Sequence, residues 1–136
     1  MKIAITKRVH FCAGHRLYNP EFSDEKNFEI FGLCSNPNGH GHNFVLEVTV
    51  SGEPELQTGM IINLTDLKKI INTSIVEKVD HKNLNLDVDF MQDVIPTTEV
   101  LATKVFQILD HELGNSLLDR VTLWESENNR FEVSRS

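Results

Sequence analysis

Cysteine is scarce in this chain of 136 residues, which has only Cys12 and Cys34. Two cysteines are too few for a disulfide framework, and in a reducing compartment both would stay as free thiols. Long apolar runs are missing too, so no segment is predicted to cross a membrane. Charges at Lys2, Lys7 and Arg8 interrupt the N-terminus too early for a signal peptide. These absences predict a soluble protein of the cytoplasm.

Positive charge is also in short supply. The net charge is −7 at neutral pH, whereas nucleic acid and anionic membranes bind to basic surfaces. We therefore expect neither nucleic acid nor membrane as a partner. A phosphorylated small molecule is still compatible with this charge, because a few local cations can receive it. The candidate cations are Lys7, Arg8, Arg16 and Lys26.

A single domain, residues 1–136, is expected from the length and from a hydrophobic fraction of 40%. No internal repeat or low-complexity stretch interrupts it. Alternating apolar and polar residues predict two strands, over Lys2–Phe11 and over Phe44–Gly52. A loop rich in turn-forming residues, 18–39, separates them.

Two helices are predicted after these strands. Asn63 is a suitable N-cap for the first helix, whose apolar pattern fades near Val79. The second should begin with Thr97 or Thr98 as its cap and stop at Gly114. Both helices have one apolar stripe, so each should pack on a sheet.

The chain should close with a hairpin that turns through residues 127–129, after a loop at 80–95 between the helices. The element order is then ββααββ. We expect an α+β fold in which a four-stranded, mostly antiparallel sheet carries both helices on one face. Such a sheet has free edges and an uncovered face, which pairing between subunits can cover, so a homo-oligomer is predicted.

A metal site is indicated by His40, Gly41 and His42 at the entry to the second strand. Side chains alternate along a strand, so both rings should point the same way, towards the apolar side, where an unpartnered imidazole would be costly. A metal ion removes that cost, and glycine leaves room for the backbone to approach a ligand closely. His15 follows the first strand closely enough to join. Three neutral nitrogens leave Zn²⁺ an open fourth position, as in catalytic sites.

Two other interpretations of these histidines stay open. A lone His-Gly-His arises easily by chance. Alternatively, Cys12 would complete a closed structural Cys-His₃ site, although structural zinc sites usually contain more sulfur. His10 and His111 are interpreted as ordinary surface residues.

Groups suited to proton transfer lie at two further places. Cys34 is in a polar, turn-rich loop near the proposed ligands, where a thiolate would act as a general base; the alternative is a small buried apolar residue. Asp80 and His81 are adjacent, so the carboxylate would support the charged imidazole. An ordinary histidine at a helix end explains that pair equally well.

Glu125 is predicted to point inwards. It shares strand parity with Val121 and Leu123, and a buried carboxylate is tolerated mainly when it is paired or hydrogen-bonded. A ligand with neighbouring N–H donors would satisfy it. A salt bridge between subunits, or a β-bulge that turns the side chain outwards, would serve as well.

Six segments carry a likeness to a known family. They are Phe11–Tyr18, Phe31–Asn43, Leu67–Lys69, Val79–Asn85, Thr97–Glu99 and Trp124–Ser126. Together these segments resemble the 6-pyruvoyltetrahydropterin and 6-carboxytetrahydropterin synthases of the tunnelling fold, over nearly the whole chain and closest to the pyruvoyl branch.

The resemblance implies a role for each candidate residue. His15, His40 and His42 would bind zinc, and Cys34 would be the catalytic thiol. Asp80 and His81 would complete the proton-transfer set. Glu125 would anchor the pterin through two parallel hydrogen bonds, assisted by Thr97 and Thr98.

The family's reaction is a triphosphate elimination by a carbon–oxygen lyase of tetrahydrobiopterin biosynthesis. It converts 7,8-dihydroneopterin triphosphate into 6-pyruvoyl-5,6,7,8-tetrahydropterin and needs no nicotinamide. Family members assemble as homohexamers of two stacked trimers, with the sheets joined into barrels and active sites between subunits. The same arrangement is expected here.

Cys12 is a departure from the family, whose members commonly carry serine there, and a second thiol near the metal would alter ligation or sensitivity to oxidation. The rival function is 6-carboxytetrahydropterin synthase, which feeds 7-deazaguanine (queuosine) synthesis from the same substrate. Five residues separate Cys34 from His40, a spacing that resembles the pyruvoyl branch. A third possibility is a noncatalytic, zinc-dependent assembly module.

Overall fold

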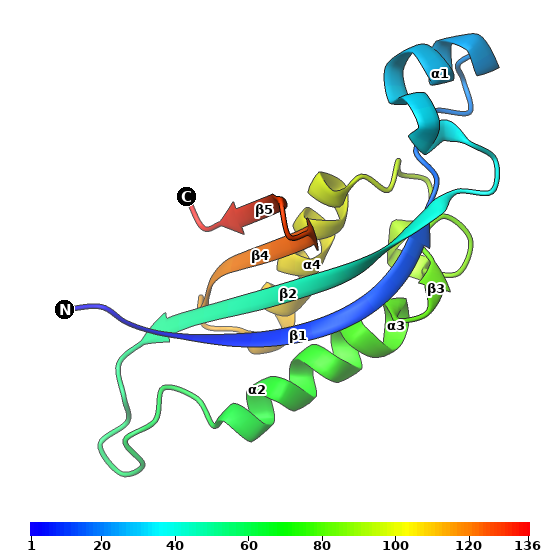
Figure 1. Ribbon diagram of the computed structural model, residues 1–136. Helices are drawn as coiled ribbons and strands as arrows, with labels where there is room; N and C mark the ends of the chain where they lie inside the picture. Colours follow the sequence, from blue (N-terminus) through cyan, green and yellow to red (C-terminus); the bar gives the residue numbers. More distant parts are fainter.

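The computed structural model describes residues 1–136 and contains a five-stranded sheet in the order β3-β1-β2-β4-β5 (Figure 1). The main strands are β1 (Ile3–His15), β2 (His40–Gly52), β4 (Leu118–Ser126) and β5 (Asn129–Ser134). Each is antiparallel to its neighbour, and the two-residue β3 (Lys82–Asn83) runs parallel to the end of β1. The predicted four-stranded antiparallel sheet is therefore confirmed, with one short strand added at its edge.

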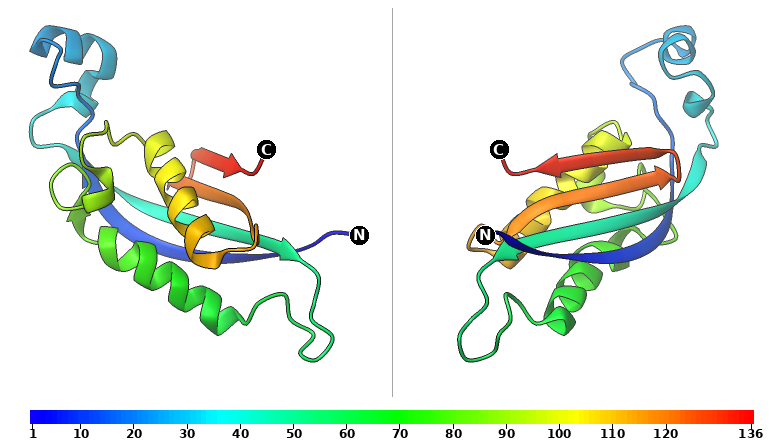
Figure 2. Two further views of the ribbon diagram at one scale, coloured as in Figure 1. Left: turned by 180° about the vertical axis from the view of Figure 1, so that it is seen from behind. Right: turned by 60° about the vertical axis from the view of Figure 1, so that its left-hand side comes forward.

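Helices cover one face of this sheet. The helices of the chain are α1 (Asp24–Phe31), α2 (Leu64–Ile71), α3 (Glu77–Val79) and α4 (Thr98–Leu113), with 3₁₀ turns η1 (Gly32–Ser35) and η3 (Asp89–Met91) and a π-helical stretch η2 (Asn72–Val76). α2, η2 and α3 follow one another without a break. This run and α4 lie on the same side of the sheet, as predicted (Figure 2). None of the helices combines the length and the apolar character that crossing a membrane requires.

The ends of the two long helical segments follow the predicted capping. The Asn63 side chain accepts a hydrogen bond from the Thr65 N–H at 2.8 Å, and the Thr97 hydroxyl accepts one from the Val100 N–H at 3.2 Å. Each such cap stabilises a helix by about 1 kcal/mol. Gly114 ends α4 with a φ of 67°, a left-handed value that glycine adopts without a Cβ penalty.

The segment 18–39 differs from the prediction, because it contains α1 rather than only loop. Ser23 caps this helix by accepting from the Lys26 N–H at 3.1 Å, and Asp24 and Glu25 occupy its first turn. The helix stands away from the rest of the molecule, beyond the end of the sheet (Figure 1). Apolar residues of this helix such as Phe28 and Ile30 are exposed. The sequence therefore lacks the apolar stripe by which a helix packed on a core is recognised.

The core lies between the sheet and the two long helical segments. The inward-facing side chains of β2 are almost completely buried, and those of α2 and α4 pack against them. The fully buried aliphatic residues include Leu46, Val48, Leu67, Ile71, Ile75, Leu101, Val105, Leu109, Val121 and Leu123. Each fully buried side chain of this size stabilises the fold by roughly 1.5–3 kcal/mol, which fixes the register of β1, β2 and β4.

The opposite face of the sheet carries no helix and is polar. There the Thr6 and Thr49 hydroxyls lie 2.8 Å apart, and the Trp124 indole donates to the Glu47 carboxylate at 3.0 Å. The outer edge of β5 has no partner strand, and β3 covers β1 only at its end. The open face and free edges on which the oligomer prediction depends are therefore present, while the oligomer itself stays a prediction.

Candidate metal centre and its surroundings

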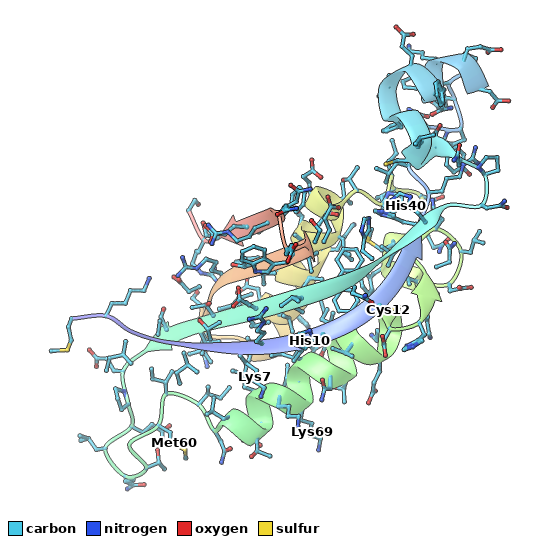
Figure 3. All side chains as sticks on the ribbon, in the orientation of Figure 1. Lys7, His10, Cys12, His40, Met60 and Lys69 are labelled. Carbon is cyan, nitrogen blue, oxygen red and sulfur yellow. The ribbon has the colours of Figure 1, made fainter.

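The pairing of β1 with β2 brings three imidazoles together. β1 extends beyond the predicted Phe11 to His15, and His15 pairs directly with His40, while Ala13 pairs with His42. Strand alternation then places all three rings on the helix-covered face. The Nε2 atoms of His15 and His40 are 3.1 Å apart, and the three ligand atoms lie within 4.8 Å of one another. Figure 3 shows His40 at the start of β2.

His15 is held more rigidly than a ligand on a loop would be. Its side chain is only 2% exposed, and its Nδ1 lies 2.8 Å from the carbonyl oxygen of Pro96. A carbonyl only accepts hydrogen bonds, so Nδ1 carries the proton of the neutral ring and Nε2 keeps its lone pair. This contact orients the ring as outer-shell partners orient the histidine ligands of known metal sites.

The surroundings also favour the neutral form of two of the imidazoles. Burial has the largest effect on the pKa of His15 and lowers it; the hydrogen bond to the Pro96 carbonyl raises it, and the neighbouring His40 and His42 lower it again, so the pKa is lowered overall. Burial and the nearby His42 likewise lower the pKa of His40. A metal binds the neutral form of histidine. These donors therefore fit a borderline-soft divalent ion such as Zn²⁺ at neutral pH.

A glycine is required at this centre, but it is Gly39 rather than Gly41. Gly39 has a φ of 68°, and a Cβ there would lie 2.7 Å from the carbonyl oxygen of His15. Gly41 pairs with Gly14, and a Cβ on Gly41 would meet ordinary contact distances. The turn before β2 is thus packed directly against the peptide of His15, which sets His40 beside it.

Cys12 does not join the cluster. It shares strand parity with the exposed side chains of β1, such as Thr6 and His10, and points to the helix-free face. For Cys12 to reach the three imidazoles, β1 would have to shift its register by one residue, which would move all its side chains to the opposite face. The structure therefore gives no support to a closed Cys-His₃ site formed within one chain.

Glu125 faces the metal centre, as predicted from its parity. The β4–β5 pairing is irregular between Trp124 and Ser126, so the bulge considered from the sequence exists, yet it does not turn Glu125 out. The carboxylate accepts a hydrogen bond from the Thr98 hydroxyl at 2.6 Å and lies 4.0 Å from Nε2 of His42. It is 21% exposed, which leaves it accessible to a ligand.

Thr97 and Thr98 have different positions. Thr97 is the N-cap of α4, and its hydroxyl is used by the Val100 N–H. Thr98 is 3% exposed and holds the Glu125 carboxylate. Of the two threonines, only Thr98 therefore contacts the group predicted to bind substrate.

Asp80 and His81 form a hydrogen-bonded pair at the edge of the sheet. Nδ1 of His81 lies 3.0 Å from the Asp80 carboxylate, and the imidazole is 80% exposed. The Cys12 N–H donates to Asp80 at 2.9 Å, and the His81 N–H donates back to the Cys12 carbonyl. The hydrogen bond from the Cys12 N–H lowers the pKa of Asp80, and the one from His81 lowers it further. The carboxylate is thereby kept ionised next to the imidazole.

Cys34 lies apart from this pair. Its thiol is half-buried in η1, and no hydrogen bond joins it to Asp80, His81 or the three imidazoles. A hollow of about 540 Å³ is lined by both His42 and His81, but Cys34 is not part of its wall. One chain thus brings the metal ligands and Glu125 together, and it leaves the predicted proton-transfer groups divided.

The Pro96 carbonyl is a part of the site that the sequence did not predict. A backbone acceptor has no residue type, so no pattern in the sequence points to it. The only available signal was its position directly before the cap of α4, a helix predicted to cover the face on which the histidines lie.

The fold and this centre define a class of α+β proteins in which three histidines, placed to hold a metal ion, lie on the helix-covered face of an antiparallel sheet. Comparison with known proteins narrows the class. The model of a family described as 6-pyruvoyl tetrahydropterin synthase matches residues 4–136. The chain belongs to this family.

Individual relatives agree with the family match. A 6-pyruvoyl tetrahydrobiopterin synthase from Pongo abelii is 47% identical over 125 residues, and one from Homo sapiens is 46% identical; each alignment covers 92% of this chain and 86% of the relative. The solved structure of the Caenorhabditis elegans 6-pyruvoyl tetrahydropterin synthase has a TM-score of 0.93 and 36% identity. That match covers 100% of this chain and 97% of the other, so the predicted fold class is confirmed.

Proposed function

We propose that this chain is a lyase that converts 7,8-dihydroneopterin triphosphate into 6-pyruvoyl-5,6,7,8-tetrahydropterin and releases triphosphate. The observation that carries the proposal is the convergence of three imidazoles beside an accessible carboxylate, Glu125. The relatives' names supply the substrate class.

The metal we propose is Zn²⁺, held by His15, His40 and His42. Bound there, it would act as a Lewis acid that makes the substrate's side-chain hydroxyls and the adjacent C–H bonds more acidic. The three protein nitrogens leave a position for a substrate oxygen. The Pro96 carbonyl supports this arrangement by keeping Nε2 of His15 directed at the ion.

Glu125 is proposed to anchor the pterin ring. A carboxylate accepts two parallel hydrogen bonds from a ring N–H and its adjacent amino group, which fixes the orientation of the ring. Because Thr98 already holds one carboxylate oxygen at 2.6 Å, the anchor is preorganised. Its position 4.0 Å from His42 would direct the substrate side chain towards the metal ligands. Thr97 would assist only by starting α4 at the right place.

Cys34, Asp80 and His81 are proposed to move protons during the internal rearrangement. His81 uses Nδ1 to contact Asp80, so Nε2 is the atom that exchanges a proton with substrate. The ionised carboxylate of Asp80 stabilises the imidazolium while the proton is held. Cys34 would take the second proton as a thiolate and return it as a thiol. Both free cysteines would be preserved in a reducing compartment such as the cytoplasm.

The separation of Cys34 from His81 supports active sites between subunits. We propose a homohexamer of two stacked trimers, in which free strand edges pair and the polar sheet face is enclosed. A neighbouring copy would then bring its Asp80–His81 pair to the Cys34 and metal centre of the first.

Incubation of the zinc-loaded enzyme with 7,8-dihydroneopterin triphosphate tests the proposal. Mass spectrometry should show the pyruvoyl product and free triphosphate, and a chelator should stop both. The 6-carboxy product would assign the chain to the rival branch instead. Zinc-dependent assembly with no triphosphate release would identify a noncatalytic module.

A further inference from the structure

The last residues of β1, and Arg16 just after it, are hydrogen-bonded along one edge by the segment 80–85. The peptide groups of Cys12, Gly14 and Arg16 all point to the free edge of the strand, and the segment 80–85 satisfies each of them in turn. The Leu84 N–H donates to the Gly14 carbonyl at 2.8 Å. The segment that carries Asp80 and His81 is therefore fastened along the same strand that ends in the metal ligand His15.

Asn85 forms the last of these links with its side chain. Its Oδ1 accepts from the Arg16 N–H at 2.8 Å, and its Nδ2 donates to the Arg16 carbonyl at 2.9 Å. A side-chain amide offers both a donor and an acceptor. The Asn85 amide therefore makes the two hydrogen bonds that a neighbouring strand would otherwise make to the backbone of Arg16. The backbone of Arg16 is thus fixed although β1 has already ended.

From this fixed position Arg16 reaches the turn that contains Cys34. Its Nε donates to the carbonyl of the buried Ser35 at 2.8 Å, and its guanidinium carbon lies 3.9 Å from the centre of the Tyr18 ring. The Leu17 N–H donates to the carbonyl of Cys34 itself at 2.8 Å. Two consecutive carbonyls of η1 are therefore bound by the two residues that follow His15.

We propose that Arg16, set in place by Asn85, is the positioning residue that fixes Cys34 relative to the metal centre. This inference rests on the proposed catalytic role of Cys34. Arg16 forms no salt bridge, and its side chain contacts the Ser35 carbonyl and the Tyr18 ring instead. Lysine cannot make both contacts, because an ammonium lacks the planar fork that donates sideways while stacking on an aromatic ring.

Two variants and one control test the proposal in the zinc-loaded, assembled enzyme. Arg16→Lys removes the Nε donor and keeps the charge. Asn85→Asp keeps the acceptor for the Arg16 N–H and removes the donor. Arg130→Lys is the matched control, because that guanidinium also lies over an aromatic ring, Trp124, on the far side of the sheet.

Both site variants should lower kcat by about tenfold or more, because small displacements of a reacting group cost large factors in rate. KM and zinc content should stay within about twofold of wild type, and the double variant should be no slower than the worse single one, because the two residues act at one junction. Iodoacetamide should label Cys34 at a changed rate, read by peptide mass, while the rate at Cys12 is unchanged.

A wild-type kcat in Arg16→Lys, together with an inactive Cys34→Ala, would overturn the proposal. Loss of zinc in proportion to the loss of kcat would overturn it too, because Arg16 would then act through His15. If Arg16→Lys does not fold, Asn85→Asp decides by the same criteria. Turnover retained in Cys34→Ala would instead contradict the proposed function.

Discussion

The metal centre and the proton-transfer groups are built in opposite ways. His15 is 2% exposed and held by a backbone carbonyl, whereas the side chain of His81 is 80% exposed at a sheet edge. The register of two neighbouring strands assembles the three metal ligands within one chain. Within that chain, no hydrogen bond joins the Cys34 side chain to Asp80 or His81, and Cys34 does not line the hollow beside His81. We therefore predict that the single chain is sufficient to bind the metal, whereas turnover requires the proposed assembly.

Removing the thiol should have the largest effect. Cys34→Ala is expected to abolish turnover, by about a thousandfold or more for a lost acid–base group that also acts with partners. Zinc should stay bound at one ion per chain, because Cys34 does not contact the ligands. Cys12→Ala is the matched thiol control. If Cys34→Ala also lost its zinc, the thiol would belong to the metal centre, and the separation of the metal ligands from the proton-transfer groups would be contradicted.

Mixing two inactive variants tests the divided site directly. His81→Asn preserves the left-handed backbone at this position, where φ is 60°, because asparagine tolerates that conformation. Subunits of Cys34→Ala and His81→Asn, refolded together in equal amounts, should regain about a quarter of the wild-type rate if each site combines groups from two chains. A mixture as inactive as its components would show that both groups act within one chain.

Two glycines, Gly39 and Gly59, test whether the turn before β2 positions the metal ligand His40. Gly39 and Gly59 have similar φ values, 68° and 71°, but only at Gly39 would a Cβ meet the His15 peptide. Alanine in this conformation should cost about 1–2 kcal/mol of folding free energy at Gly59, and more at Gly39, where the Cβ would also collide with the His15 carbonyl oxygen. Only Gly39→Ala should also weaken zinc binding, by about tenfold, in a titration against a chelator. Equal zinc affinity in the two variants would show that the turn does not set His40.

The smallest expected effect is a pH dependence of the metal-free protein. The pKa values of His15 and His40 are lowered by burial, so the unfolded chain takes up protons first as pH falls below ~6.5. The free energy of unfolding should therefore decrease from that pH downwards. Denaturation at a series of pH values should show that the free energy of unfolding changes less steeply with pH in His15→Gln than in a His10→Gln control. Identical slopes would contradict the buried, neutral state of His15.

Local patterns predicted much of this molecule. Alternation placed His42 and Glu125 on the inner face, and capping signals placed the ends of α2 and α4. The helix α1 escaped prediction because its stability comes from Ser23 and two acidic residues rather than from an apolar stripe. The division of the proton-transfer set was not predictable either, since adjacency in sequence says nothing about which copy of the chain supplies each group.

Contacts with backbone carbonyls formed the part that no pattern revealed. The Pro96 oxygen orients His15, and the Ser35 oxygen receives Arg16. Every residue has such an acceptor, so residue identity does not mark the ones that matter. The carbonyls that matter are selected only by the path of the chain. It brings His15 into contact with a residue 81 positions away, and Arg16 into contact with one 19 positions away.

X-ray absorption at the zinc edge of the purified, fully loaded protein tests the metal centre most directly. It should show one zinc per chain bound by three imidazole nitrogens and a light oxygen donor, with no sulfur. The zinc should be lost when His42 is replaced by asparagine. Sulfur among the ligands, or an unchanged spectrum in His42→Asn, would contradict a three-histidine centre that keeps a place for substrate.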